Sequence, residues 1–186
     1  ELRQNCIAVT FTQADLTSLA LKKKPYSDVY HDLDKNRAYS VRFPDGAFIQ
    51  MMYMFENQRI SSHRLAFYSS PHLDQFQNDP ELYSDDIIFA DVIARQIVPF
   101  PLRFDFSSDE AKFVEIKHPK THLTLGQYEN CRIPVTSPVT PYWFINFVLQ
   151  NFYHTPYHHF VDKLQKFETT FEDTISVSER GIIHLH

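Results

Sequence analysis

The chain contains 186 residues, which is enough for one domain of ordinary size but small for two. Hydrophobic residues make up 43% and charged residues 22%, and 17 Phe, 10 Tyr and 1 Trp supply apolar surface for a core, so a disordered chain is excluded. With a net charge of −5, binding to nucleic acid or an anionic membrane would need a local basic patch. The chain begins at Glu1 without a methionine and ends at His186 inside an alternating stretch, so we expect the natural protein to extend beyond one or both ends.

Glycine and cysteine are both scarce. Only Gly46, Gly126 and Gly181 occur, where an average chain of this length carries roughly 13. Their wide spacing excludes a Gly-rich phosphate loop, a dinucleotide-binding fingerprint and a glycine-flanked nucleophile elbow. Cys6 and Cys131 form no Cys-x-x-Cys pair, so we expect a protein of the reducing cytoplasm. No apolar run approaches the roughly 18 residues that cross a bilayer, so we expect no membrane partner, and no cofactor or metal is predicted.

The first part of the chain predicts an extended segment, a helix and a meander. Residues 2–11 alternate as a short strand, and residues 12–23 carry apolar positions at helical spacing before Pro25 ends that helix. The period changes to two over residues 37–68, with turn residues at two points. The expected antiparallel strands cover residues 37–43, 47–55 and 59–68.

Loops, a helix and a second pair of strands are expected next. The polar stretch 74–81 predicts a surface loop, and Ser84 predicts the N-cap of a helix over residues 85–97. Residues 102–106 and 112–118 then predict two strands that pair across a polar turn.

Thr140-Pro141 is the clearest boundary in the chain, because an N-cap residue precedes a proline at the first helical position. It predicts a helix through about Tyr153, with four apolar residues on one side: Phe144, Phe147, Val148 and Phe152. A shorter helix is predicted in the tail from the spacing of Phe160, Leu164 and Phe167, followed by a turn at residues 178–181. These elements together predict a single α+β domain over residues 1–186, an antiparallel sheet of about five or more strands packed against two to four helices.

Residues 118–135 (HPKTHLTLGQYENCRIPV) resemble the signature of a bacterial family catalogued as domain of unknown function 2290. Residues 102–106 (LRFDF), 138–141 (PVTP) and 151–153 (NFY) resemble further parts of the same pattern, with weaker likeness around His63-Arg64. The resemblance implies a match over the whole domain. It supplies no catalytic residues, because the family has no settled activity.

Side chains that can carry chemistry are concentrated between Arg103 and Arg132. On an extended strand, Arg103 and Asp105 point to one face and the intervening Phe104 to the other. The charged pair can therefore form the wall of a cleft, or an ordinary ion pair on a solvated sheet.

His118 and His122 have i, i+4 spacing, but Pro119 disfavours a helix at His118 and so argues against a shared metal ion. One of the histidines can act as a general acid or base, or both can serve as structural hydrogen-bonding groups.

The turn-rich run from Gln127 to Arg132 also contains Asn130 and Cys131. The Arg132 guanidinium is suited to clamp a phosphate or carboxylate, and Cys131 is either a nucleophile next to a histidine or a small buried apolar residue.

The first functional hypothesis is a nucleic-acid-directed component, nuclease-like or defence-associated, that works without a metal ion. Its catalytic residues are His118, His122 and Asp105. Its substrate-binding residues are Arg103, Arg132, Gln127 and Asn130. The alternative is a non-catalytic interaction module whose aromatic surface docks a partner protein or forms a homodimer. A third hypothesis is a small-molecule enzyme that uses Cys131 with a histidine.

The single site of the first hypothesis has a geometric test. If residues 102–106 pair with residues 112–118, His118 should lie near Arg103 on an open edge, within about 15 Å. The helix that begins after Thr140 should cover the opposite face, with three of its phenylalanines buried against the sheet: Phe144, Phe147 and Phe152.

Overall fold

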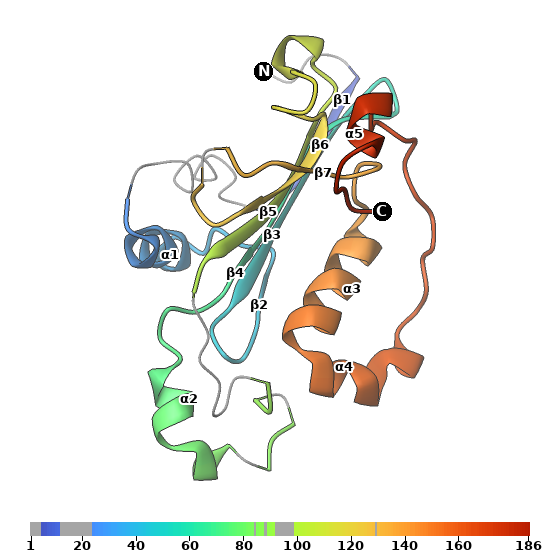
Figure 1. Ribbon diagram of the computed structural model, residues 1–186. Helices are drawn as coiled ribbons and strands as arrows, with labels where there is room; N and C mark the ends of the chain where they lie inside the picture. Colours follow the sequence, from blue (N-terminus) through green and yellow to red (C-terminus); the bar gives the residue numbers. More distant parts are fainter. Residues whose placement is uncertain (1–4, 12–23, 84, 88, 92–98, 129) are drawn as a thin grey trace.

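A seven-stranded antiparallel sheet runs through the centre of the part of the chain that the structure describes (Figure 1). The computed structural model describes residues 5–11, 24–83, 85–87, 89–91, 99–128 and 130–186. The strands are β1 (Cys6–Val9), β2 (Val41–Arg42), β3 (Phe48–Glu56), β4 (Arg59–Tyr68), β5 (Pro101–Ser107), β6 (Thr121–Leu125) and β7 (Ile133–Pro134). Their order across the sheet is β1-β3-β4-β5-β6-β7, and β2 also pairs with β3.

Helices flank this sheet. They are α1 (Tyr26–Lys35), α2 (Asp74–Asn78), α3 (Pro141–Phe152), α4 (His154–Phe160) and α5 (Val177–Arg180), with short 3-10 turns η2 (Pro80–Leu82), η3 (Glu110–Lys112) and η4 (Val161–Lys163). Figure 1 shows α1 and α3 on opposite sides of the sheet. The predicted fold class, an α+β domain built on an antiparallel sheet, is confirmed. None of the helices that the structure describes is long and apolar enough to cross a membrane.

The β3–β4 hairpin forms where the meander predicts it. Asn57 and Gln58 form its turn with positive φ angles of 50° and 65°, the backbone form that a tight hairpin with the natural strand twist requires. The two strands pair along nearly their full length, from Phe48 opposite Tyr68 to Glu56 opposite Arg59. This long pairing fixes which side chains of β4 face each side of the sheet.

The α3 face holds the main core. Thr140 accepts a hydrogen bond from the Trp143 backbone N–H at 3.4 Å, so the predicted N-cap is confirmed. Phe144 and Val148 are fully buried, and Phe104 of β5 contacts the Phe144 ring edge-on. Two other predicted core phenylalanines, Phe147 and Phe152, pack against this core but are only partly buried.

Among the described residues, α1 is the helix that packs on the opposite face, and it covers one end of the sheet. Val29, Tyr30 and Leu33 of α1 are buried in a cluster that includes Phe48 and Tyr68 at one end of the sheet. The sequence predicted no helix at this position. The polar side chains further along β4, β5 and β6 lie outside the area that α1 covers.

The strand that pairs with β5 is not the predicted one. Residues 121–125 form β6 and pair with β5, from Leu102 opposite Leu125 to Phe106 opposite Thr121. The predicted strand 112–118 is instead a tight turn closed by a bridge between Val114 and His118, with Ile116 at a φ of 66°. Pro119 lacks the N–H group that a continuing ladder needs, so the chain pairs only beyond it.

Smaller corrections concern the loops and the tail. The predicted surface loop 74–81 contains α2 and the start of η2. Of the predicted helix 85–97, the described residues form turns, and the remainder lies outside the described residues, as does the predicted helix 12–23. The tail helix lies earlier than predicted, at α4 and η4, and the predicted turn 178–181 is largely the short helix α5 with a capping box.

Replacing Phe144 by alanine should destabilise the protein by about 3–5 kcal/mol, because a fully buried ring leaves a cavity between α3 and the sheet. Chemical denaturation measures this change. Gln150→Ala, at an exposed position of the same helix, is the control and should change stability by less than about 0.5 kcal/mol. Equal effects of the two substitutions would contradict the packing described here.

Candidate functional site

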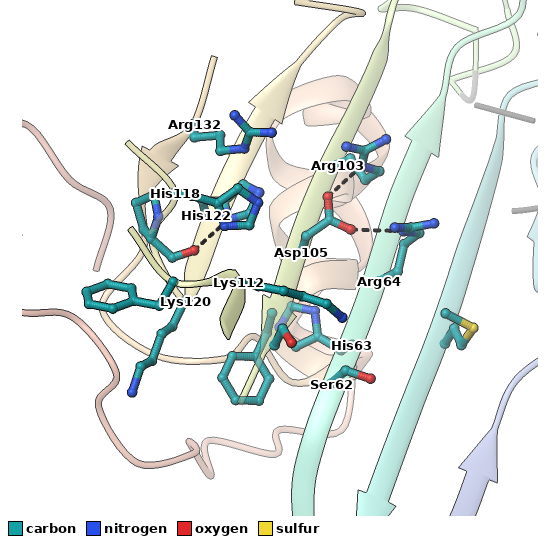
Figure 2. Close-up of a pocket in the computed structure, with 15 residues that line it drawn as sticks. Ser62, His63, Arg64, Arg103, Asp105, Lys112, His118, Lys120, His122 and Arg132 are labelled. Carbon is teal, nitrogen blue, oxygen red and sulfur yellow. Dashed lines mark hydrogen bonds and ion pairs between the residues drawn. The ribbon is translucent and has the colours of Figure 1, made fainter. Parts of the chain in front are cut away.

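A pocket of about 380 Å³ opens on the sheet face that α1 leaves uncovered (Figure 2). Its floor is a row of residues on neighbouring strands, because Arg64 of β4 lies opposite Asp105 of β5 and Asp105 lies opposite His122 of β6. The segment between β5 and β6 contributes the wall, including Lys112 and His118. Residues between positions 52 and 132 therefore line one concave site.

A single carboxylate joins two arginines on this floor. The Arg64 Nε donates a hydrogen bond to one oxygen of Asp105 at 2.9 Å, and the Arg103 Nε donates to the other at 2.6 Å. The three side chains are only 25%, 16% and 15% exposed for Arg64, Arg103 and Asp105. Both bonds use Nε, and the terminal nitrogens of the two guanidinium groups make no further hydrogen bond to any residue that the structure describes.

The environment keeps Asp105 ionised. Burial acts to raise the pKa of its carboxyl group, but the charges and hydrogen bonds of Arg103 and Arg64 outweigh burial and hold the pKa below its ordinary value. Both carboxylate oxygens are occupied by arginine donors. Asp105 therefore holds both arginines in place, and its predicted catalytic role stays a prediction.

His122 is a neutral imidazole with a defined tautomer. Its Nδ1 lies 2.9 Å from the Pro119 carbonyl oxygen, which can only accept, so Nδ1 carries the proton and Nε2 is left with a lone pair. Burial lowers the pKa of His122 below its ordinary value, although the Asp105 charge opposes the change. Such a histidine can accept a proton through Nε2 at neutral pH.

His118 lies on the wall beside His122. The centroids of the two imidazole rings are 5.0 Å apart, and the rings meet edge to face at 67°. The backbone N–H and carbonyl groups of His118 each form a hydrogen bond with Val114. Both histidines therefore belong to the same pocket despite the non-helical backbone between them. Their position suits proton transfer to a ligand on the floor.

His63 points to the α3 side of β4, opposite to Arg64, and yet both residues line the pocket, although alternation along the strand predicts that only one of them can join a given site. Its Nε2 accepts a hydrogen bond from the Val139 N–H at 2.9 Å, so Nδ1 carries the proton, and Nδ1 has no partner among the described residues. Burial lowers the pKa of His63 to about 4. His63 is therefore an uncharged structural histidine at pH 7.

Each of the two lysines of the wall lies next to a carboxylate of the same segment, which offsets its charge. Lys120 pairs with Glu110 at 2.5 Å and lies over the Phe113 ring, while Lys112 is 3.7 Å from Asp109. Arg132, just before β7, forms no ion pair with any residue that the structure describes. The pocket thus carries a positive charge in a protein whose net charge is −5.

A family signature matches residues 1–186, the whole chain, and is described as "Uncharacterized conserved protein (DUF2290)". The chain belongs to the DUF2290 family. No curated protein and no solved structure matches it. The family identity therefore leaves the chemistry of this DUF2290 protein to be argued from the pocket itself.

The pocket of this DUF2290 protein contains five of the seven predicted site residues: Arg103, Asp105, His118, His122 and Arg132. The other two are not part of its lining. Gln127 donates a hydrogen bond to the Lys24 carbonyl oxygen, and Asn130 is exposed. Cys131 does not line the pocket either, so neither pocket histidine is placed to activate its thiol there. The roles of the five residues that converge stay predictions.

Arg64 is the main residue that is absent from the predicted set. Only the cross-strand register of β4 and β5 places it beside Asp105, and strand alternation alone does not reveal which strands are neighbours. No group of three or more metal-ligating side chains occurs among the residues placed by the structure.

A second and more apolar cavity, of about 490 Å³, lies beside α3 and is lined in part by Tyr142, Trp143 and Phe147. Trp143 is 43% exposed. Docking of a partner protein or a second copy through this aromatic surface stays a prediction.

Replacing Asp105 by asparagine should destabilise the protein by about 2 kcal/mol, because an amide oxygen replaces an ionised acceptor between two largely buried arginines. The change is measured by urea denaturation at pH 7. Asp173→Asn, which removes one charge from an exposed ion pair with Arg180, is the matched control and should cost at most about 1 kcal/mol. A smaller cost for Asp105→Asn than for the control would contradict the role of Asp105.

Lowering the pH from 7 to 4 should destabilise this DUF2290 protein by about 3 kcal/mol through His63 alone. The reason is that His63 binds a proton near pH 6.5 in the unfolded chain but only near pH 4 in the folded chain, where its pKa is lowered. The stabilising contribution is complete above about pH 6.5 and disappears as the pH falls toward 4. Denaturation curves across this range should show a weaker pH dependence for His63→Gln than for the wild type. His159→Gln, at an exposed position, should leave the pH dependence unchanged.

Proposed function

We propose that this protein acts on nucleic acid and that its cationic pocket binds a phosphate of the substrate. The observation that carries the proposal is the meeting of three arginines, Arg64, Arg103 and Arg132, in one concave site with three histidines, two of which, His118 and His122, lie side by side. Guanidinium groups bind phosphate oxygens through paired, charge-assisted hydrogen bonds. A local site of this kind overcomes the unfavourable net charge of the chain, because binding depends on the field at the pocket.

Preorganisation supports phosphate binding by Arg64 and Arg103. Each side chain is held through its Nε by Asp105, so little conformational entropy is lost when its terminal nitrogens bind a ligand. Free surface arginines would lose more side-chain freedom on binding. Asp105 thus fixes the Arg64 and Arg103 side chains in an orientation in which both can bind one phosphate.

The histidines support a phosphodiester cleavage that uses side chains for proton transfer. In the proposed reaction, His122 Nε2 takes the proton of an attacking water while the water oxygen bonds to phosphorus. The bond from phosphorus to the leaving sugar oxygen breaks, and a protonated His118 donates a proton to that oxygen. The arginines stabilise the extra negative charge of the transition state.

Binding and cleavage are tested separately with RNA and DNA oligonucleotides in the presence of EDTA. We expect salt-dependent binding by the wild type and, for Arg132→Gln, weaker binding with a salt slope reduced by about 1. His122→Gln should bind nearly as well as the wild type, but its cleavage rate should fall by roughly 100-fold or more. Arg180→Gln, at an exposed arginine outside the pocket, is the control and should behave like the wild type. If neither RNA nor DNA showed salt-sensitive binding, the proposed function would be overturned.

A further inference from the structure

We propose that the pocket receives a terminal phosphate, the phosphomonoester at the end of a nucleic-acid strand, rather than an internal phosphodiester of the backbone. This inference rests on the proposed function, because it specifies which phosphate of a nucleic acid the same site takes. It follows from three features of the pocket: its charge, the number of its guanidinium groups and its closed side.

The first feature is the balance of charge in the pocket. Arg64, Arg103 and Arg132 contribute three positive charges and Asp105 one negative charge, which leaves +2 on the floor. The lysines of the wall add little, since nearby carboxylates from the same segment pair with both. A phosphomonoester carries about −1.5 to −2 at pH 7. Each internal phosphodiester carries one negative charge, so the monoester fits the pocket better.

The second feature is the arrangement of the guanidinium groups. Arg64 and Arg103 lie on β4 and β5, whereas Arg132 comes just before β7, on the other side of β6 in the strand order, and all three are labelled in Figure 2. Three donor groups can therefore approach a ligand from two directions. A phosphomonoester offers three terminal oxygens, whereas an internal phosphodiester offers two non-bridging oxygens. The monoester therefore offers each of the three guanidinium groups a terminal oxygen of its own, whereas in the diester two of them must share one.

The third feature is the wall that closes one side of the pocket. Residues 108–120 fold back beside the floor, where the Ser108 N–H donates to the Ser61 carbonyl oxygen and Lys120 bonds to Glu110. Phe113 and His118 of this segment line the pocket. A strand bound by an internal phosphate must leave the site in two directions, but a strand bound by its end leaves in only one. The wall therefore favours an end group.

The test measures binding of one single-stranded oligonucleotide in three forms: with a 5′-phosphate, with a 3′-phosphate and with hydroxyl groups at both ends. Fluorescence anisotropy at pH 7.5 in EDTA, with the slow His122→Gln variant, separates binding from cleavage. We expect one phosphorylated form to bind at least about tenfold more tightly than the hydroxyl form, as paired charge-assisted hydrogen bonds predict.

Two comparisons link this preference to the pocket. In the His122→Gln background, Arg132→Gln should reduce the preference to less than about threefold, while Arg180→Gln should retain it. The melting temperatures of these variants establish that they remain folded. The preference should also shrink at pH 5.5, because a phosphomonoester loses its second charge below a pKa of about 6.

The outcomes separate the inference from the function on which it rests. Equal, salt-sensitive binding of all three oligonucleotides would overturn the terminal-phosphate inference and leave the proposed function standing. Absence of binding to any oligonucleotide would overturn both. If a nucleoside monophosphate bound as tightly as the phosphorylated oligonucleotide, the strand would contribute nothing, and the assignment to nucleic-acid ends would be wrong.

Discussion

The bridge that Asp105 makes between Arg64 and Arg103 is the interaction on which the site depends. Two guanidinium groups on neighbouring strands would repel each other in a partly buried setting, but one ionised carboxylate accepts a hydrogen bond from each. Because both bonds use Nε, Asp105 itself occupies none of the terminal nitrogens of either guanidinium group. The same contact links β4 to β5 and makes the cationic floor part of the sheet.

The two faces of the sheet explain why a polar pocket exists next to a well-packed core. On one face, α3 buries Phe144 and Val148 against the aromatic side chains of the strands. On the other face, α1 covers only the end around Phe48 and Tyr68. Further along this face, the segment before β6 lines the pocket together with the strands, and burial lowers the pKa of His122 on its floor.

Local patterns predicted the orientation of individual side chains well. Alternation along β5 places Arg103 and Asp105 opposite Phe104, and the cap at Thr140 defines the start of α3. These features depend on backbone geometry within a few residues. The partner of β5 and the exclusion of Gln127 from the pocket were not predicted correctly, because both depend on where a loop returns to the sheet.

The sequence by itself determined the fold class, the faces of the strands and the concentration of charged and imidazole side chains between Arg103 and Arg132, because periodicity and capping are encoded locally. Only the tertiary structure decided that Arg64 joins Asp105 and that β6 pairs with β5. Strand pairing depends on the closure of loops and on the packing of both sheet faces at once. Two-residue alternation along a strand predicts the face to which a side chain points. Its neighbours on that face depend on which strands pair and in what register.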